Sequence, residues 1–324
     1  MMPNLQIRWP GNRPFAFTVI DDTDWATVQN VKPVYDLLAD LGFRTTKTVW
    51  MFQSENGINP GETCEDAEYR SWVVALQNRG FEIALHNAAA GTSDRVRSLR
   101  ALDGFRDLFG NDTAIHCNHT GCLENLYWGD TRLSGWRRGV YRSLTRGVRT
   151  EISRGHVAGD PLFWGDACRE RVRYVRNFVF DQLNTLKMCP EMPYYDPAKP
   201  YVNLWFASAD AGNLATFLRN FTYAAIDRLV SERGLCIVYS HFGGGFAPGG
   251  HLDREFANRM TYIAGKGGWF APVSTVLDHL RGEAGADERI IAPAALASLE
   301  SRWLQNRTKV EVAKKVRRAL RPRK

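Results

Sequence analysis

The sequence predicts an α/β fold built on parallel strands. Short apolar segments rich in β-branched and aromatic residues alternate with longer segments whose apolar residues recur at helical spacing. Strands that are separated by helices are typical of βαβ units, in which the strands run parallel. About seven such units fit the chain, and they favour either a closed barrel or a doubly wound open sheet.

The first part of the chain supplies four of the predicted strands and three helices. The strands are expected at 15–20, 45–52, 81–85 and 113–117, and the helices at 25–41, 67–77 and 93–109. Gly42 and Gly80 follow two of these helices, where glycine commonly ends a helix. Thr23 and Asp24 directly precede the first helix, and we expect them to cap it.

Residues from about 123 to 200 mix glycine, arginine, tryptophan and proline without a dominant period. We interpret them as an insertion with some helix, for example over 168–186. Regular segments then resume, with strands predicted at 201–207, 235–239 and 269–271 and helices at 214–233, 254–264 and 274–280. We therefore expect one catalytic domain over 1–299 and a basic helical tail over 300–324.

The composition is that of a folded globular protein. The chain has 324 residues, of which 44% are hydrophobic and 24% charged, so a sizeable core can form. The formal net charge of +7 is concentrated in the tail. Between Arg302 and Lys324 there are ten Lys or Arg and one acid, so the rest of the chain carries −2. The body therefore does not predict a specific nucleic-acid partner.

The sequence also carries expectations about location. The N-terminus lacks the apolar segment of a signal peptide, and no stretch has the roughly 20 apolar residues of a membrane span. The six cysteines are scattered through a large chain, which favours reduced thiols. We expect a cytoplasmic protein.

Acids and imidazoles follow the predicted strands where each strand ends. They are Asp21 and Asp22, His86, His116 and His119, Asp210 and His241. Because the carboxyl ends of parallel strands meet at one edge or rim, these side chains are expected to lie together. A carboxylate and neutral imidazoles suit zinc and similar divalent metals. A second carboxylate can then act as a general base, and another histidine can protonate a leaving amine.

Four segments resemble a known family. FTVIDDTD (17–24), RGFEIALHN (79–87), CIVYSHF (236–242) and GGWFAPVSTVLDHL (267–280) are similar to motifs of the polysaccharide deacetylases, the NodB-like carbohydrate esterases. The similarity spans about 15–280, except for the middle insertion. The resemblance implies a distorted α/β barrel of about seven strands. It also implies a metal-dependent hydrolase that removes an N-acyl group, such as acetyl, from a saccharide, with zinc as the expected metal.

The resemblance also assigns roles by position. It implies that Asp21 is the base, that Asp22 and His86 are metal ligands, and that His241 is the acid. Asp210, in ASADAG, resembles the family's acid beside the substrate.

The sequence departs from the family pattern at a metal ligand. The second histidine expected four residues after His86 is Ala90. We hypothesise that His119, in CNHTG, replaces it from the neighbouring strand end, where parallel strands lie about 4.8 Å apart. His116 is the rival candidate for this ligand, and the absence of a third ligand is the other alternative.

Two other functions are consistent with the sequence. One is a carbohydrate-binding relative with a degenerate metal site, which the change to Ala90 favours. The other is a hydrolase of a glycosidic or different C–N bond on the same fold; a glycosidase would need two carboxylates about 5–9.5 Å apart. The basic tail is expected to attach to an anionic membrane surface, where each basic residue contributes about 1 kcal/mol.

Overall fold

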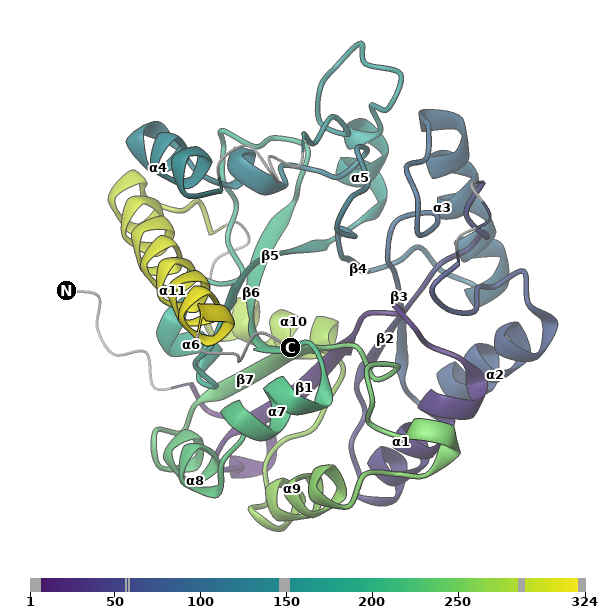
Figure 1. Cartoon of the computed structure of the whole chain (residues 1–324), viewed down its shortest axis with the longest axis vertical. Helices are drawn as coiled ribbons and strands as arrows, with labels where there is room; N and C mark the ends of the chain where they lie inside the picture. Colours follow the sequence, from purple (N-terminus) through teal and green to yellow (C-terminus); the bar gives the residue numbers. More distant parts are fainter. Residues whose placement is uncertain (1–6, 56, 58, 146–151, 285–288, 320–324) are drawn as a thin grey trace.

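A computed structural model describes residues 7–55, 57, 59–145, 152–284 and 289–319. Seven parallel strands close into a barrel in the order β1 to β7, and the helices surround it (Figure 1). The strands are β1 (Ala16–Asp21), β2 (Thr46–Val49), β3 (Glu82–Leu85), β4 (Ile115–His116), β5 (Tyr174–Phe180), β6 (Leu204–Ala211) and β7 (Leu235–Ser240). The predicted barrel of parallel strands is confirmed.

Helices and short 3-10 turns make the connections. The helices are α1 (Val28–Asp40), α2 (Ala67–Asn78), α3 (Arg95–Phe109), α4 (Gly135–Thr145), α5 (Gly165–Arg171), α6 (Thr185–Met188), α7 (Leu214–Asn220), α8 (Tyr223–Ser231), α9 (Arg254–Gly265), α10 (Val273–Ala284) and α11 (Pro293–Ala319). The 3-10 turns are η1 (Pro10–Asn12), η2 (Gly129–Arg132) and η3 (Pro248–Gly250).

Strand β1 shows why the barrel closes. It pairs in parallel with β2 on one side and with β7 on the other, from Ala16 opposite Leu235 to Asp21 opposite Ser240. Every residue of β1 is buried, because one face meets the barrel interior and the other meets the helices. Its sequence, AFTVID, accordingly reads as a nearly continuous apolar segment, as strands buried on both faces do.

The start of α1 differs from the prediction in a way that affects the site. Thr27 caps the helix: its side chain accepts a hydrogen bond from the backbone N–H of Asn30, whose side chain bonds back to the Thr27 N–H. The expectation that Thr23 and Asp24 cap this helix is therefore wrong. Asp24 is left free to use its carboxylate elsewhere.

The middle of the chain holds a barrel strand that the sequence pattern concealed. The helix predicted over 168–186 is wrong, because α5 ends at Arg171 and β5 follows. Six of the seven residues of β5 are buried, so the segment shows no alternation of polar and apolar residues. Two smaller differences concern 214–233, which forms two helices separated by a cap at Thr222, and 269–271, which forms only a bridge between Trp269 and Ala16.

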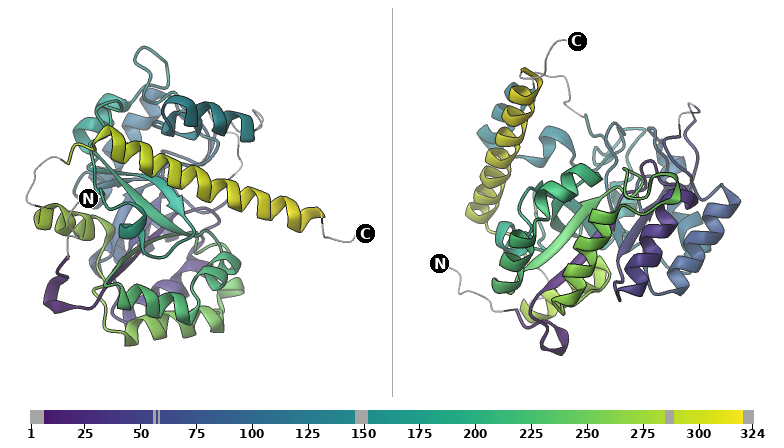
Figure 2. Two further views of the ribbon diagram at one scale, coloured as in Figure 1. Left: turned by 90° about the vertical axis from the view of Figure 1, so that its left-hand side faces the viewer. Right: turned by 60° about the horizontal axis from the view of Figure 1, so that its bottom comes forward.

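The last helix crosses the predicted boundary between barrel and tail. Helix α11 begins before residue 300, and Leu299 and Trp303 are buried against the body. Its C-terminal part extends away from the body (Figure 2). Among the described residues, no helix combines the length and apolar character that crossing a membrane requires.

Candidate metal centre and active site

The loop after β1 places Asp24 at the centre of a group of histidines. His86, which follows β3, puts its Nε2 atom 3.2 Å from Asp24 Oδ2. His119, in the loop after β4, puts its Nε2 atom 3.0 Å from Asp24 Oδ1. One ligand atom from each of the three residues lies within 4.8 Å of the others, so the group could hold a metal ion.

A third imidazole approaches the same carboxylate. His241, directly after β7, places Nε2 at 3.5 Å from Asp24 Oδ2. These four residues come from the ends of β1, β3, β4 and β7, which is the rim where parallel barrels carry their chemistry. The predicted gathering of strand-end residues therefore includes His86, His119 and His241.

The far nitrogen of each imidazole is held by a fixed partner. Nδ1 of His86 lies 2.9 Å from the carbonyl oxygen of Cys117, and Nδ1 of His241 lies 2.7 Å from that of Gly212. Nδ1 of His119 lies 3.4 Å from Sγ of Cys122. A carbonyl partner requires a proton on Nδ1, so Nε2 is the nitrogen of His86 and His241 that could lose its proton and bind a metal ion. This is the arrangement in which histidines hold metals.

The electrostatics of the centre favour an ionised carboxylate. Burial alone would raise the pKa of Asp24, but hydrogen bonds with His119 and His86 outweigh it and hold that pKa well below its usual range. Burial would lower the pKa of His119, yet the bond to Asp24 raises it. A divalent cation would compete with protons for the same atoms, since ligand nitrogens and oxygens must be deprotonated to bind.

Trp50, at the end of β2, supports two of the imidazoles. Its ring stacks on His86 with centroids 6.0 Å apart and meets His119 edge to face at 5.4 Å. The indole is fully buried. A rigid aromatic wall of this kind limits the rotation of both rings and fixes where their Nε2 atoms point.

Asp22 has a different partner from the one that the sequence predicts. Its carboxylate accepts a two-pronged hydrogen bond from the guanidinium of Arg176 on β5, with Nη1–Oδ1 at 2.8 Å. Its Oδ2 lies 3.8 Å from His86 Nε2, so the carboxylate borders the centre without belonging to the ligand group. Burial opposes ionisation of Asp22, but Arg176 and His86 lower its pKa overall.

Asp21 points to the other side of the barrel wall. Its carboxylate lies 3.1 Å from Nζ of Lys47, accepts a hydrogen bond from Tyr35 of α1 at 3.0 Å, and accepts another from the Phe242 N–H at 2.7 Å. Both Asp21 and Lys47 are fully buried. Successive side chains of an extended strand point to opposite faces, so Asp21 meets the helix layer while Asp22 meets the interior. Asp21, predicted as the base, lies on the face away from His86.

Asp210 orients His241 indirectly. Its Oδ1 accepts a hydrogen bond from the Gly212 N–H at 3.0 Å, and the carbonyl of Gly212 holds Nδ1 of His241. The Tyr239 hydroxyl lies 3.1 Å from Nε2 of the same histidine. Asp210 therefore fixes the turn that positions His241.

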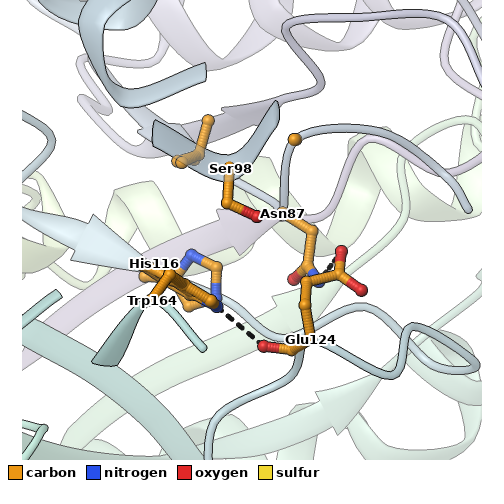
Figure 3. Close-up of a pocket in the computed structure, with 7 residues that line it drawn as sticks. Asn87, Ser98, His116, Glu124 and Trp164 are labelled. Carbon is orange, nitrogen blue, oxygen red and sulfur yellow. Dashed lines mark hydrogen bonds between the residues drawn. The ribbon is translucent and has the colours of Figure 1, made fainter. Parts of the chain in front are cut away.

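His116, the rival metal ligand, faces away from the centre. It lines a cavity of about 10 Å³ together with Ser98, Glu124 and Trp164 (Figure 3). Burial lowers the pKa of His116 to about 3, so its ring is neutral. Across this cavity the Glu124 carboxylate accepts a hydrogen bond from Asn87, whose own oxygen accepts from the His119 N–H. The cavity wall thus supports the loop that carries His119.

The donor set fits a divalent metal of the zinc type. One carboxylate and two imidazoles give three protein ligands, with a further imidazole beside them. Ala90 stands where the resemblance places a second histidine, and Nε2 of His119 approaches the Asp24 carboxylate from the next strand end. The sequence pattern did not indicate that Asp24 lies among these imidazoles, and it gave no sign of Arg176, whose strand was itself not recognised.

Comparison with known proteins supports the fold. No family model matches the sequence, and no curated protein matches it. A solved protein from Mycobacterium smegmatis aligns with 88% of this chain and 96% of its own at 11% identity, with a TM-score of 0.50. One from Pseudomonas aeruginosa PAO1 aligns with 86% of this chain and 95% of its own at 13% identity, also with a TM-score of 0.50.

Both of these structures are provisionally named polysaccharide deacetylases. An allantoinase structure aligns with 85% of this chain and 93% of its own at 12% identity, with a TM-score of 0.49. The chain therefore has the fold of the polysaccharide deacetylases and is a divergent example of it.

Proposed function

We propose that this protein is a metal-dependent hydrolase that removes an N-acyl group, such as acetyl, from a saccharide. The observation that carries the proposal is the convergence of three imidazole Nε2 atoms on the Asp24 carboxylate. The fold shared with proteins named polysaccharide deacetylases supports the choice of substrate class.

Asp24, His86 and His119 would hold the metal. A divalent metal bound there would supply Lewis-acid chemistry, polarising an acyl carbonyl and making a water molecule easier to deprotonate. Zinc is our expectation because the donors are one carboxylate and imidazoles. The protein's part is to fix those donors, which the partners of the Nδ1 atoms and the wall formed by Trp50 do.

Asp22 fits the role of general base better than Asp21. Its carboxylate borders the centre, whereas that of Asp21 is surrounded by Lys47, Tyr35 and the Phe242 N–H on the far side of the strand. Asp22 would accept the proton from the attacking water as the water oxygen bonds to the acyl carbon. Arg176 would hold the carboxylate in place.

His241 fits the role of general acid. Its Nδ1 is fixed by the Gly212 carbonyl, and its Nε2 faces the centre beside the Tyr239 hydroxyl. A proton on Nε2 would be delivered to the amine nitrogen as the C–N bond breaks. The Asp24 carboxylate lies 3.5 Å from this Nε2 atom.

The test is hydrolysis of N-acetylated oligosaccharides by protein stripped of metal and then loaded with zinc, cobalt or nickel. We expect metal-dependent release of acetate, with an exposed-histidine variant, His251→Ala, as the matched control for His86→Ala. New reducing ends without acetate would show a glycosidase instead. Binding of the oligosaccharide without any hydrolysis would favour the carbohydrate-binding alternative. The cytoplasmic location stays a prediction.

A further inference from the structure

Trp25 combines two unusual features beside the centre. Its side chain is 51% exposed, although tryptophan is usually well buried. Its backbone has φ of +58°, a left-handed conformation that bulky residues rarely adopt. It directly follows Asp24. Outliers of this kind persist only where surrounding structure enforces them, and they gather at functional sites.

Three segments of the chain hold this conformation. The carbonyl oxygen of Trp25 accepts a hydrogen bond from the side chain of Asn30 at 2.9 Å. The carbonyl of the next residue, Ala26, accepts from the Glu62 N–H at 2.7 Å. Gly243 packs so closely that a Cβ atom there would lie 2.4 Å from the Trp25 carbonyl group. The backbone conformation that carries the indole is therefore built into the fold.

The indole stands against the histidine assigned as the acid. Its ring lies 5.1 Å from that of His241, centroid to centroid, at an interplanar angle of 68°. Trp50 offers a contrast, because it also contacts imidazoles of the centre but is fully buried. Trp50 is enclosed, whereas about half of Trp25 is exposed while its ring contacts His241.

We propose that Trp25 forms a stacking subsite for the pyranose ring that carries, or neighbours, the acylated amine. This inference rests on the proposed function. The apolar C–H face of a sugar ring fits the electron-rich face of an indole, and a rigid ring loses little conformational entropy on binding. The rigid loop would set the distance between the sugar ring and His241.

The test compares Trp25→Ala and Trp25→Phe with wild type on an N-acetylglucosamine tetrasaccharide and on 4-nitrophenyl acetate. Trp25→Ala is expected to raise KM for the tetrasaccharide by about tenfold, with a smaller effect on kcat. Trp25→Phe should recover most of that loss. The control is Tyr223→Ala, which removes another exposed aromatic side chain, on α8. Equal losses on the ester and the tetrasaccharide would overturn the subsite, since they would indicate a general disturbance of the centre.

Equilibrium binding of the tetrasaccharide separates this proposal from the proposed function. If wild type hydrolyses nothing but binds the tetrasaccharide, weaker binding by Trp25→Ala would still support the subsite. Unchanged binding in that variant, or no binding by wild type, would overturn it. Thermal unfolding of each variant would show that the fold is intact.

A second, independent inference comes from α4. Trp136, Val140 and Leu144 recur every four residues along this helix and are 66%, 38% and 47% exposed. The opposite side of α4 is already used, because Tyr141 packs on Trp303 of α11 with ring centroids 5.4 Å apart. The helix thus presents an apolar stripe that the described residues do not cover.

Basic residues border this stripe. Arg137 pairs with the buried Glu300 of α11, and Arg138 and Arg142 share the carboxylate of Asp130. Helix α11 then continues past Trp303, and the sequence from Arg302 onward carries ten basic residues and one acid (Figure 2). The three arginines of α4 are paired with acids, so the excess positive charge lies on the adjoining α11 beyond Arg302. An apolar helix face beside strong positive charge is typical of segments that lie in the surface of an anionic membrane.

We infer that the stripe on α4 and residues 302–319 of α11 together bind an anionic lipid surface. The apolar side chains would enter the headgroup boundary, and the basic side chains would meet lipid phosphates. The concentration of positive charge distinguishes this occupant from a second copy of the chain, which would repel it.

Sedimentation of the full-length protein with vesicles tests this inference. Wild type should sediment with phosphatidylcholine vesicles containing phosphatidylglycerol and stay in solution with phosphatidylcholine alone. Both Trp136→Ser/Leu144→Ser and Lys314→Glu/Lys315→Glu/Arg317→Glu should lose most of the sedimenting fraction. Val96→Ser, at another exposed apolar residue, is the control. Equal sedimentation of all variants, or a dimer that Trp136→Ser/Leu144→Ser dissociates, would overturn it.

Discussion

The two faces of β1 and the loop that follows it place acids in opposite environments. Asp21 points to the helix layer, where Lys47, Tyr35 and the Phe242 N–H neutralise and hold it. Asp22 and Asp24 point to the other side, where they meet Arg176 and three imidazoles. Asp21 therefore has only structural contacts among the residues named here. Asp22 and Asp24 direct their carboxylates toward the group of imidazoles. We therefore expect Asp21 to contribute to stability, and Asp22 and Asp24 to contribute to function.

The largest expected effect is the loss of turnover when a histidine beside Asp24 is replaced. His86→Ala and His119→Ala should each lower turnover of an N-acetylated saccharide by about a thousandfold or more, because each removes a metal ligand. Assays with excess metal, with His251→Ala as control, would check this. Full activity in His119→Ala would mean that His119 does not replace the ligand lost at Ala90.

Substitutions around Asp21, on the helix side of β1, should lower the free energy of unfolding and leave the metal content unchanged. Lys47→Met leaves the Asp21 carboxylate buried without its cation, which is expected to cost about 3–5 kcal/mol of unfolding free energy. Lys47→Met/Asp21→Asn should recover most of that loss, because both charges are then removed. Chemical denaturation measures both values. Loss of bound metal from folded Lys47→Met protein would contradict the view that the Asp21 side of β1 affects stability alone.

A smaller effect on turnover should separate the two candidates for the base. Asp22→Asn is expected to lower kcat by about a hundredfold while metal stays bound, as the loss of a general base does. Lys47→Met/Asp21→Asn, which alters only the outward side, should keep most of its turnover. The reverse ranking would return the role of base to Asp21, as the family resemblance implies.

The smallest expected effect concerns His156, an imidazole to which the described part of the chain offers no carboxylate partner. Nδ1 of His156 accepts a hydrogen bond from the Tyr127 N–H at 3.2 Å, and burial lowers the pKa of His156 to about 4. The fold therefore prefers neutral His156, so its contribution is complete above pH 6.5 and is lost as the pH falls toward 4. We expect His156→Gln to reduce the loss of unfolding free energy over that range by about 2 kcal/mol. Identical pH profiles would contradict this.

The sequence predicted the architecture well because strands and helices each had their own pattern. Strands such as β1 and β7 read as short apolar segments, and α1 showed apolar residues at helical spacing. β5 was missed because its residues are buried on both faces and the segment includes Arg176 and Asn177. No local pattern reveals that a buried arginine lies opposite Asp22 across the barrel.

The sequence indicated the histidines of the candidate site but not Asp24, because only the histidines follow a recognisable strand pattern directly. His86, His119 and His241 follow strands directly, so their position in the chain was informative. Asp24 stands two residues past Asp22, and its sequence context suggests a helix cap. Because Thr27 caps α1, the Asp24 carboxylate is available to the imidazoles. The distinction between Asp22 and Asp24 depends on tertiary contacts that no single motif records.

The ligand assignment is tested by the metal content of purified Asp24→Asn and Asp22→Asn proteins, each loaded with zinc and dialysed. We predict about one equivalent of zinc in wild type and in Asp22→Asn, and little in Asp24→Asn, because Asp24 is the carboxylate that faces His86 and His119. Zinc retained by Asp24→Asn but lost from Asp22→Asn would contradict it and would return the metal to the carboxylate now held by Arg176.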